Sequence, residues 1–185
     1  AGVGNQTVNE ESSTSLTLSA TDVDGDSLTY QLDSATAALG VSLSGTSLSI
    51  DPATDFTGAG SVTVSVSDGS LSDSETFTVT VNNINDAPVL SAVFDLTIPE
   101  DTSTTVALTA TDIDGDSLTY SITSSSAELN ATVSGNTVSL APDSDYSGTG
   151  NVSVQVSDGV LTDSDTFAVT VSGTNDAPVL ASVGA

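Results

Sequence analysis

The side chains of this sequence with the clearest chemical potential are acidic, and their spacing favours metal binding. The densest cluster reads DVDGD over residues 22–26 and returns as DIDGD over residues 112–116. In an extended segment, side chains two residues apart point the same way, so Asp22 and Asp24 can reach one cation together. Calcium prefers oxygen ligands, and without a cation these neighbouring carboxylates would repel one another. The pattern therefore favours a cation at both clusters, and a divalent ion such as Ca²⁺ is the natural candidate.

The net charge of the chain also favours an external cation. The sequence has 25 Asp and Glu residues, no Lys, Arg or His, and a formal net charge of -25. No carboxylate can pair with a basic side chain, and the mutual repulsion opposes a compact state. The same negative field argues against nucleic acid and anionic membranes as partners. A salt-adapted surface that only keeps the protein soluble is an alternative, but such charges would be scattered, and these are clustered.

The residue inventory disfavours an enzyme. Without His, Cys, Lys or Arg there is no ordinary nucleophile–base pair and no cationic group to stabilise an oxyanion. A carboxylate pair can hydrolyse a glycosidic bond, but a sugar site would want an aromatic platform, and the chain has no Trp. We therefore expect no catalytic residues.

Two absences bear on where the protein works. The chain has no Cys, so packing or metal must stabilise it, and no apolar run approaches the ~20 residues that span a bilayer. Residues 1–4 show no secretion signal, so we expect export to depend on a segment outside this sequence.

The chain consists of one unit written twice with a period of 90 residues. Residues 18–30 and 108–120 are identical at 11 of 13 positions, and the hexapeptide NDAPVL of residues 85–90 returns unchanged at 175–180. A repeat of this length is large enough to fold as a small domain. We expect domains at 1–87 and 88–185, cut at equivalent points from a longer array.

Within each repeat the apolar residues alternate with polar ones, which is typical of half-buried strands. Asp68-Gly69 between two such runs predicts a hairpin, because both residues tolerate positive φ. Pro88 indicates a short, stiff linker between the repeats. The first repeat is expected to contain about seven strands, near 4–9, 14–20, 27–33, 39–43, 47–51, 60–67 and 74–82. The fold class predicted is all-β, as two tandem seven-stranded Greek-key β-sandwiches of cadherin-like or immunoglobulin-like type.

Five sequence elements occur in the same order in both repeats. They are an acidic pair at 10–11, D-x-D-G-D-x-L-x-Y at 22–30, D-F-x-G at 55–58, V-S-D-G at 66–69 and N-D-A-P at 85–88, each returning 90 residues later with Tyr for Phe in the third. In this combination the chain resembles the cadherin-like tandem repeats of large secreted bacterial adhesins. The resemblance implies calcium ions at the junctions between neighbouring domains, held by oxygen ligands alone.

The resemblance also implies which residues would bind calcium. The junction inside the chain would take Glu10 or Glu11, Asp55, Asn85, Asp86, Asp112, Asp114 and Asp158, with Asn83 a weaker candidate. A preceding repeat would share Asp22, Asp24 and Asp68, and a following repeat would share Glu100 or Asp101, Asp145, Asn175 and Asp176. Because the linker and the motif at Asp55 carry fewer acidic positions than the family pattern, two ions per junction fit as well as about three.

Other acidic residues are assigned simpler roles. Asp26 and Asp116 are interpreted as turn-capping residues. Asp73, Glu75, Asp163 and Asp165, on the approach to the last strand of each repeat, are expected to be solvated.

The function expected is that of a calcium-rigidified extender in an extracellular adhesin on a bacterial surface, whose partners are the neighbouring repeats. A subunit of a self-assembling filament, with like chains meeting laterally or end to end, is one alternative. A homophilic or sugar-binding module is another.

Overall fold

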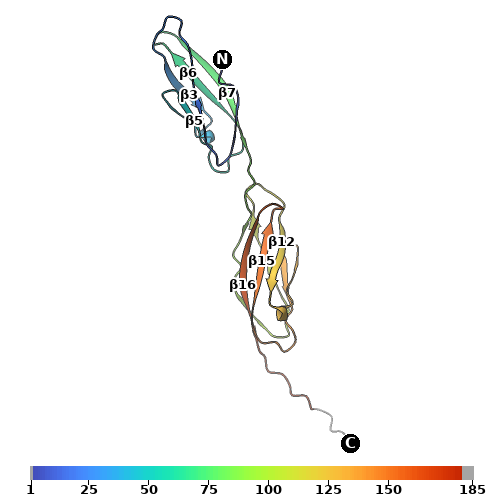
Figure 1. Ribbon diagram of the computed structural model, residues 1–185. Helices are drawn as coiled ribbons and strands as arrows, with labels where there is room; N and C mark the ends of the chain where they lie inside the picture. Colours follow the sequence, from blue (N-terminus) through green and yellow to red (C-terminus); the bar gives the residue numbers. More distant parts are fainter. Residues whose placement is uncertain (1, 181–185) are drawn as a thin grey trace. The chain divides into compact units, whose positions relative to one another are not determined.

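The computed structural model describes residues 2–180, and the chain forms two compact units, 1–84 and 85–185 (Figure 1). The expected boundary between residues 87 and 88 lies a few residues into the second unit. The described residues form strands and two single-turn 3₁₀ helices.

In unit 1 a four-stranded sheet and a three-stranded sheet share one core. The larger sheet has the order β1-β7-β6-β3 and the smaller β2-β5-β4. Strand β1 runs parallel to β7, and the other pairs are antiparallel. The elements are β1 (Gln6–Asn9), β2 (Thr14–Thr17), β3 (Thr29–Ala35), η1 (Ala37–Leu39), β4 (Ser42–Ser44), β5 (Ser47–Ile50), β6 (Gly58–Ser67) and β7 (Ser72–Asn82).

The alternation of the sequence explains this packing. On β6 and β7, Val62 lies opposite Phe77 in the register, and both side chains are buried. Leu48 and Ile50 of β5 supply the facing layer from the smaller sheet. Successive side chains of a strand point to opposite faces, so one face of each sheet is apolar and the other is polar.

Unit 2 repeats these strands 90 residues later and has one further short pair. Strand β8 (Val89–Leu90) pairs with β11 (Ala110–Thr111), and Leu90 packs into the core of unit 2. The elements equivalent to those of unit 1 are β9 (Leu96–Pro99), β10 (Thr104–Ala107), β12 (Thr119–Ser125), η2 (Ala127–Leu129), β13 (Thr132–Ser134), β14 (Thr137–Leu140), β15 (Gly148–Ser157) and β16 (Thr162–Ser172).

The predicted all-β fold class, with tandem seven-stranded sandwiches, is confirmed. One strand differs from the expectation. The segment near 39–43 begins as the 3₁₀ turn η1, whose cap Gly40 has φ of 55°, and only Ser42–Ser44 is extended. The left-handed backbone conformation favours glycine, and Gly40 ends the 3₁₀ turn in that conformation. The turn places the fully buried Leu39 in the core.

Two phenylalanines of unit 2 provide a matched test of this core. Phe167 is 0% exposed, whereas Phe94 is 83% exposed. We expect Phe167→Ala to reduce the free energy of unfolding of unit 2 by about 3–5 kcal/mol and Phe94→Ala to have almost no effect. Urea denaturation of both variants measures this, and equal losses would contradict the packing described.

Candidate metal centres

Each DxDGD turn is closed by its first aspartate. In unit 1, Oδ1 of Asp22 accepts backbone N–H bonds from Asp24 at 2.8 Å and Asp26 at 3.1 Å. In unit 2, Oδ1 of Asp112 accepts the N–H of Asp116 at 3.1 Å. The capping role expected of Asp26 and Asp116 therefore belongs to the residue four positions earlier, because its carboxylate faces the turn's own N–H groups.

The second oxygen of Asp112 is the least satisfied atom of the turn. Oδ2 of Asp112 is buried and has no hydrogen-bond partner among the described residues. Carboxylate oxygens of Asp112, Asp114 and Asp116 lie within 4.8 Å of one another. A buried carboxylate oxygen without a partner is costly, and no basic side chain exists in the chain to pair with it. A divalent cation with oxygen ligands fits this site.

The linker residues that enter unit 2 contact the same region. Nδ2 of Asn85 donates to Oδ2 of Asp158 at 2.9 Å, and the N–H of Asp86 donates to Oδ2 of Asp114 at 2.7 Å. Two neighbouring linker residues thus contact the carboxylates of Asp158 and Asp114. Unit 2 by itself therefore contains five of the residues that the sequence predicts as calcium ligands. They are Asn85, Asp86, Asp112, Asp114 and Asp158.

Asp158 also closes the hairpin between β15 and β16. Its Oδ1 accepts the N–H groups of Val160 and Leu161, each at 2.6 Å, and Asp68 makes the equivalent contacts in unit 1. The hydrogen bond from Asn85, followed by that from the N–H of Val160, lowers the pKa of Asp158 below its ordinary value of 3.8. In unit 1, N–H bonds from Leu71 and then Ser70 lower the pKa of Asp68. Both carboxylates are therefore ionised and ready to bind a cation at neutral pH.

Asp22 and Asp68 both line one groove of unit 1, so the DVDGD turn and the hairpin closed by Asp68 are neighbours. Asp24 lies in the same loop as Asp22 and is exposed. Unit 1 therefore presents at this end the counterparts of the acidic residues that cluster in unit 2.

A second acidic cluster lies at the other end of unit 2. Carboxylate oxygens of Asp101, Asp145 and Asp176 lie within 4.8 Å of one another. Oδ1 of Asp101 accepts the N–H of Asp145 at 3.3 Å, and the buried Glu100 accepts the N–H of Thr174. Desolvation, and then repulsion by Asp145, Glu100 and Asp101, raise the pKa of Asp176. The carboxylates at this site thus repel one another, and a bound cation would relieve that repulsion.

Unit 1 has the equivalent residues in the equivalent conformation. Glu10 is buried and accepts the N–H of Ile84 at 2.7 Å. Glu11 and Asp55 have φ of 55° and 58°, as Asp101 and Asp145 have 59° and 58°. Left-handed backbone at a non-glycine residue is uncommon, so its recurrence in both repeats shows that these two loops are built alike. Asn175 repeats the bond that Asn85 makes to the next residue, since Nδ2 of Asn175 donates to the carbonyl oxygen of Asp176 at 3.3 Å.

Three acidic residues expected to be solvated are hydrogen-bonded, and that expectation is wrong for them. Oδ2 of Asp163 accepts the N–H of Leu90, and Oδ2 of Asp165 accepts the N–H of Val93, at 2.8 and 2.7 Å. In unit 1, Oε2 of Glu75 accepts the N–H of Val3 at 2.8 Å. These hydrogen bonds hold the N-terminal segment of each unit against its last strand, β7 in unit 1 and β16 in unit 2. The 90-residue recurrence of these carboxylates was the only signal in the sequence.

The lowered pKa of Asp158 gives a testable pH dependence. A group whose pKa is depressed in the folded state contributes stability that is complete above the unfolded value of 3.8 and disappears as the pH falls through the folded value. We therefore expect Asp158→Asn to lower the calcium-free urea midpoint of unit 2 at neutral pH, with a loss that shrinks below pH 3.8. The exposed Glu128→Gln is the control, and a loss independent of pH would contradict the assignment.

Comparisons with known proteins agree with the repeat and the fold. The family model described as "Bacterial Ig domain" matches residues 1–82 and 85–174. "Chitinase A" of Pseudoalteromonas piscicida is 38% identical over 162 residues, covering 82% of this chain, which spans only 19% of that relative's length.

Two solved structures are similar in fold. Human protocadherin-24 EC1-2 is 20% identical, with a TM-score of 0.65 over 92% of this chain and 95% of that one. Drosophila N-cadherin EC1-4 is 13% identical, with a TM-score of 0.60 over 94% of this chain and 50% of that one. In the part of the chain that the structure describes, no helix is long and apolar enough to cross a membrane.

Proposed function

The chain belongs to the bacterial Ig domain family, as two consecutive cadherin-like copies, and from this we propose that it is a calcium-rigidified extender of an extracellular bacterial surface protein. The observation that carries the proposal is the orphan Oδ2 of Asp112 among three clustered carboxylates. In a chain without any basic side chain, an external cation is the available partner for that atom.

The ligand set proposed for the internal junction depends on the linker. The N–H of Ile84 is bonded to Glu10 of unit 1, and the N–H of Asp86, two residues later, is bonded to Asp114 of unit 2. Two linker positions separated by a single residue, 84 and 86, are therefore each hydrogen-bonded by an acidic residue of a different unit. We expect Glu10, Asp55 and Asp86 to bind one ion there, with Asp112, Asp114 and Asp158 binding others.

The cluster of Asp101, Asp145 and Asp176 inside unit 2 supports the same proposal. These residues occupy the repeat positions of Glu11, Asp55 and Asp86, so the same carboxylates recur at the end of each repeat. A site of this kind at every repeat end suits an array in which each domain shares calcium with the next.

The mechanism is mechanical. Domains joined by a short linker move relative to one another by default. Calcium bound by both domains and the linker would remove the carboxylate repulsion and cross-link the hinge. Extracellular calcium modules bind at roughly 10⁻⁴–10⁻³ M, so the hinge would be flexible at cytosolic calcium levels and stiff outside the cell.

The rest of the proposal follows from the family and the residue inventory. The relative named as a chitinase, of which this chain spans 19%, is compatible with a role for this chain as one part of a longer protein. The chain itself has no His, Cys, Lys or Arg for an ordinary nucleophile–base pair, and we assign it no enzymatic role.

A thermal melt in Ca²⁺ and in chelator, at fixed ionic strength, tests the metal. We expect Ca²⁺ to raise the midpoint, because a ligand that binds only the folded state at 100 times its Kd stabilises by about 2.7 kcal/mol. Asp112→Asn should remove most of the shift that belongs to unit 2, and the exposed Asp51→Asn, which lies in neither cluster, should keep it. An equal shift with Mg²⁺ or with added NaCl would mean that the acidity is only a screened surface.

Rigidity has a separate test. Spin labels at Ser44 and Ser134, exposed strand ends in the two units, are expected to give a broad distance distribution in chelator and a narrow one in Ca²⁺. The same labels in an Asp86→Asn background should stay broad. A distribution that is narrow without calcium would contradict the stiffening mechanism.

A further inference from the structure

The carboxylates of this chain avoid the outward faces of its larger sheets. Most of the 25 acidic residues lie in loops, and those that lie on strands are Asp33, Asp73, Glu75, Asp163 and Asp165. In the register of β15 and β16, Asp165 lies opposite the buried Val154, and Asp163 is two residues from Asp165. Because side chains two residues apart share a face, both carboxylates of β16 point to the inner side of the sheet.

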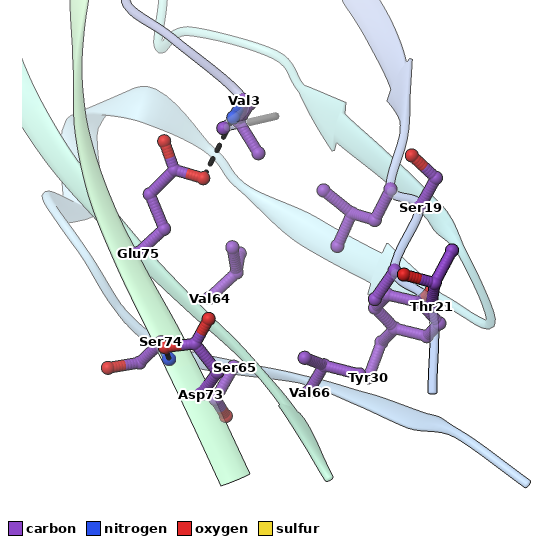
Figure 2. Close-up of a pocket in the computed structure, with 13 residues that line it drawn as sticks. Val3, Ser19, Thr21, Tyr30, Val64, Ser65, Val66, Asp73, Ser74 and Glu75 are labelled. Atoms are coloured by element: carbon purple, nitrogen blue, oxygen red, sulfur yellow. Dashed lines mark hydrogen bonds between the residues drawn. The ribbon is translucent and has the colours of Figure 1, made fainter. Parts of the chain in front are cut away.

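Hydrogen bonds hold these inward carboxylates in place. In unit 1, Glu75 lies opposite the buried Val64 and accepts the N–H of Val3 at 2.8 Å (Figure 2). Asp165 accepts the N–H of Val93 in the same way. The last strand of each unit therefore tolerates carboxylates, and strand propensity alone does not explain why its outward side has none.

Among the described residues, the outward side of the sheet β12-β15-β16-β9 carries no charged side chain, and we call it the neutral face. Its outward positions on β16, every second residue from 162 to 172, are Ser, Thr or Ala. Asp95 lies at the margin, directly before β9, and its Oδ1 accepts the N–H of Ala168 at 2.7 Å. The outward residues of β15 are Thr149, Asn151, Ser153, Gln155 and Ser157.

Hydrogen bonds between neighbouring strands order the hydroxyls of the neutral face. The hydroxyls of Ser153 and Thr166 are 2.8 Å apart, and those of Thr149 and Thr170 are 3.3 Å apart. A hydroxyl has one donor hydrogen and two acceptor lone pairs, so each group can still bind a further partner. Short side chains that are already ordered lose little conformational entropy when a partner binds.

The charge distribution favours a second copy of this chain as the partner of the neutral face. Hydroxyls and amides both donate and accept hydrogen bonds, so the face is complementary to itself. Two chains with a net charge of -25 repel each other, but physiological salt screens exposed charges beyond about 8 Å. The chains can therefore meet where no carboxylates face one another. None of the four described strands presents an outward aromatic ring on which a sugar could stack.

We propose that the neutral faces of two copies pack against each other, so that the chain associates side by side through unit 2. The same surface takes part in both copies, which makes the contact isologous. A four-stranded sheet of this length is about 15–20 Å wide and about 30 Å long, so the contact buries about 1,000 Å² in total. This area is at the lower end of specific interfaces, so the association is weak and reversible.

Unit 1 differs from unit 2 at one position of the corresponding face. Asp33 lies on the edge strand β3, and its Oδ1 accepts the hydroxyl of the outward-facing Ser65 at 2.9 Å. The counterpart of Asp33 in unit 2 is Thr123. A carboxylate on each copy brings like charges into such a contact, and this repulsion restricts the association to unit 2.

Sedimentation velocity from micromolar to millimolar protein, in chelator and with increasing NaCl, tests the proposal. We expect the parent chain to form dimers, and the association to strengthen as salt screens the remaining charges. Ser164→Asp should weaken the association constant about tenfold or more, because it buries an uncompensated charge in each copy. Ser74→Asp is the matched control, since it makes the same change at the equivalent exposed position of unit 1, and it should associate like the parent chain.

Asp33→Thr provides a test by gain of association. This variant gives unit 1 the residue that unit 2 has, so the chain then carries two neutral faces. We expect species larger than dimers in the same sedimentation experiment. A variant that forms only dimers would contradict the role assigned to Asp33.

Single cysteines locate the contact, because the chain has no Cys of its own. Ala168→Cys, on the neutral face, should react more slowly with a maleimide as the protein concentration rises. Ser139→Cys, exposed on the smaller sheet of unit 2, should react at a constant rate. Equal protection of the two cysteines would contradict the face proposed.

A parent chain that stays monomeric at millimolar concentration, or equal losses in Ser164→Asp and Ser74→Asp, would overturn the inference. An association that requires Ca²⁺ would also overturn it and would place the contact at the acidic clusters. The proposed function is tested separately, since the neutral face contains none of the proposed calcium ligands. Loss of the calcium-dependent melting shift, with association intact in chelator, would overturn the calcium sites alone.

Discussion

The absence of any basic side chain is the constraint on which the structure depends. Each of the 25 carboxylates must be solvated, accept hydrogen bonds, or bind an ion from outside the chain. Many accept backbone N–H groups, and a charge-assisted bond of this kind is stronger than one between neutral partners. In unit 2, Asp163, Asp165 and Asp95 accept the N–H groups of Leu90, Val93 and Ala168.

Other carboxylate oxygens gather in the acidic clusters at the two ends of unit 2. Asp112 illustrates this, because one of its oxygens caps the turn and the other is buried without a partner. Asp176 illustrates it at the other end of unit 2, where its neighbours raise its pKa. In both places the folded chain holds negative charges together at a cost, and only an external cation can offset that cost. The fold and the proposed calcium sites are therefore two consequences of one composition.

Much of this architecture follows from local patterns in the sequence. The strict alternation around Val62 and Phe77 predicts the two long strands, and Asp68-Gly69 predicts the hairpin between them, since both depend on neighbouring residues alone. The role of Asp163 could not be predicted in the same way. Its partner Leu90 is 73 residues away, and the contact exists only because β8 enters beside the last strand. The buried oxygen of Asp112 is likewise a product of packing, although the spacing of the carboxylates around it was visible.

The hexapeptide NDAPVL explains why the domain boundary is hard to read from the sequence. Its proline and polar residues indicate a linker, yet Leu90 belongs to the core of the unit that follows it. Asn85 and Asp86 are likewise bonded to that unit. The segment is therefore the first structural element of a repeat and not a spacer after the previous one. The same sequence recurs at 175–180, after the last strand of unit 2, and Leu180 is exposed there. In structural terms a repeat of this type therefore begins with the hexapeptide, because its leucine and its two polar residues contact the unit that follows them.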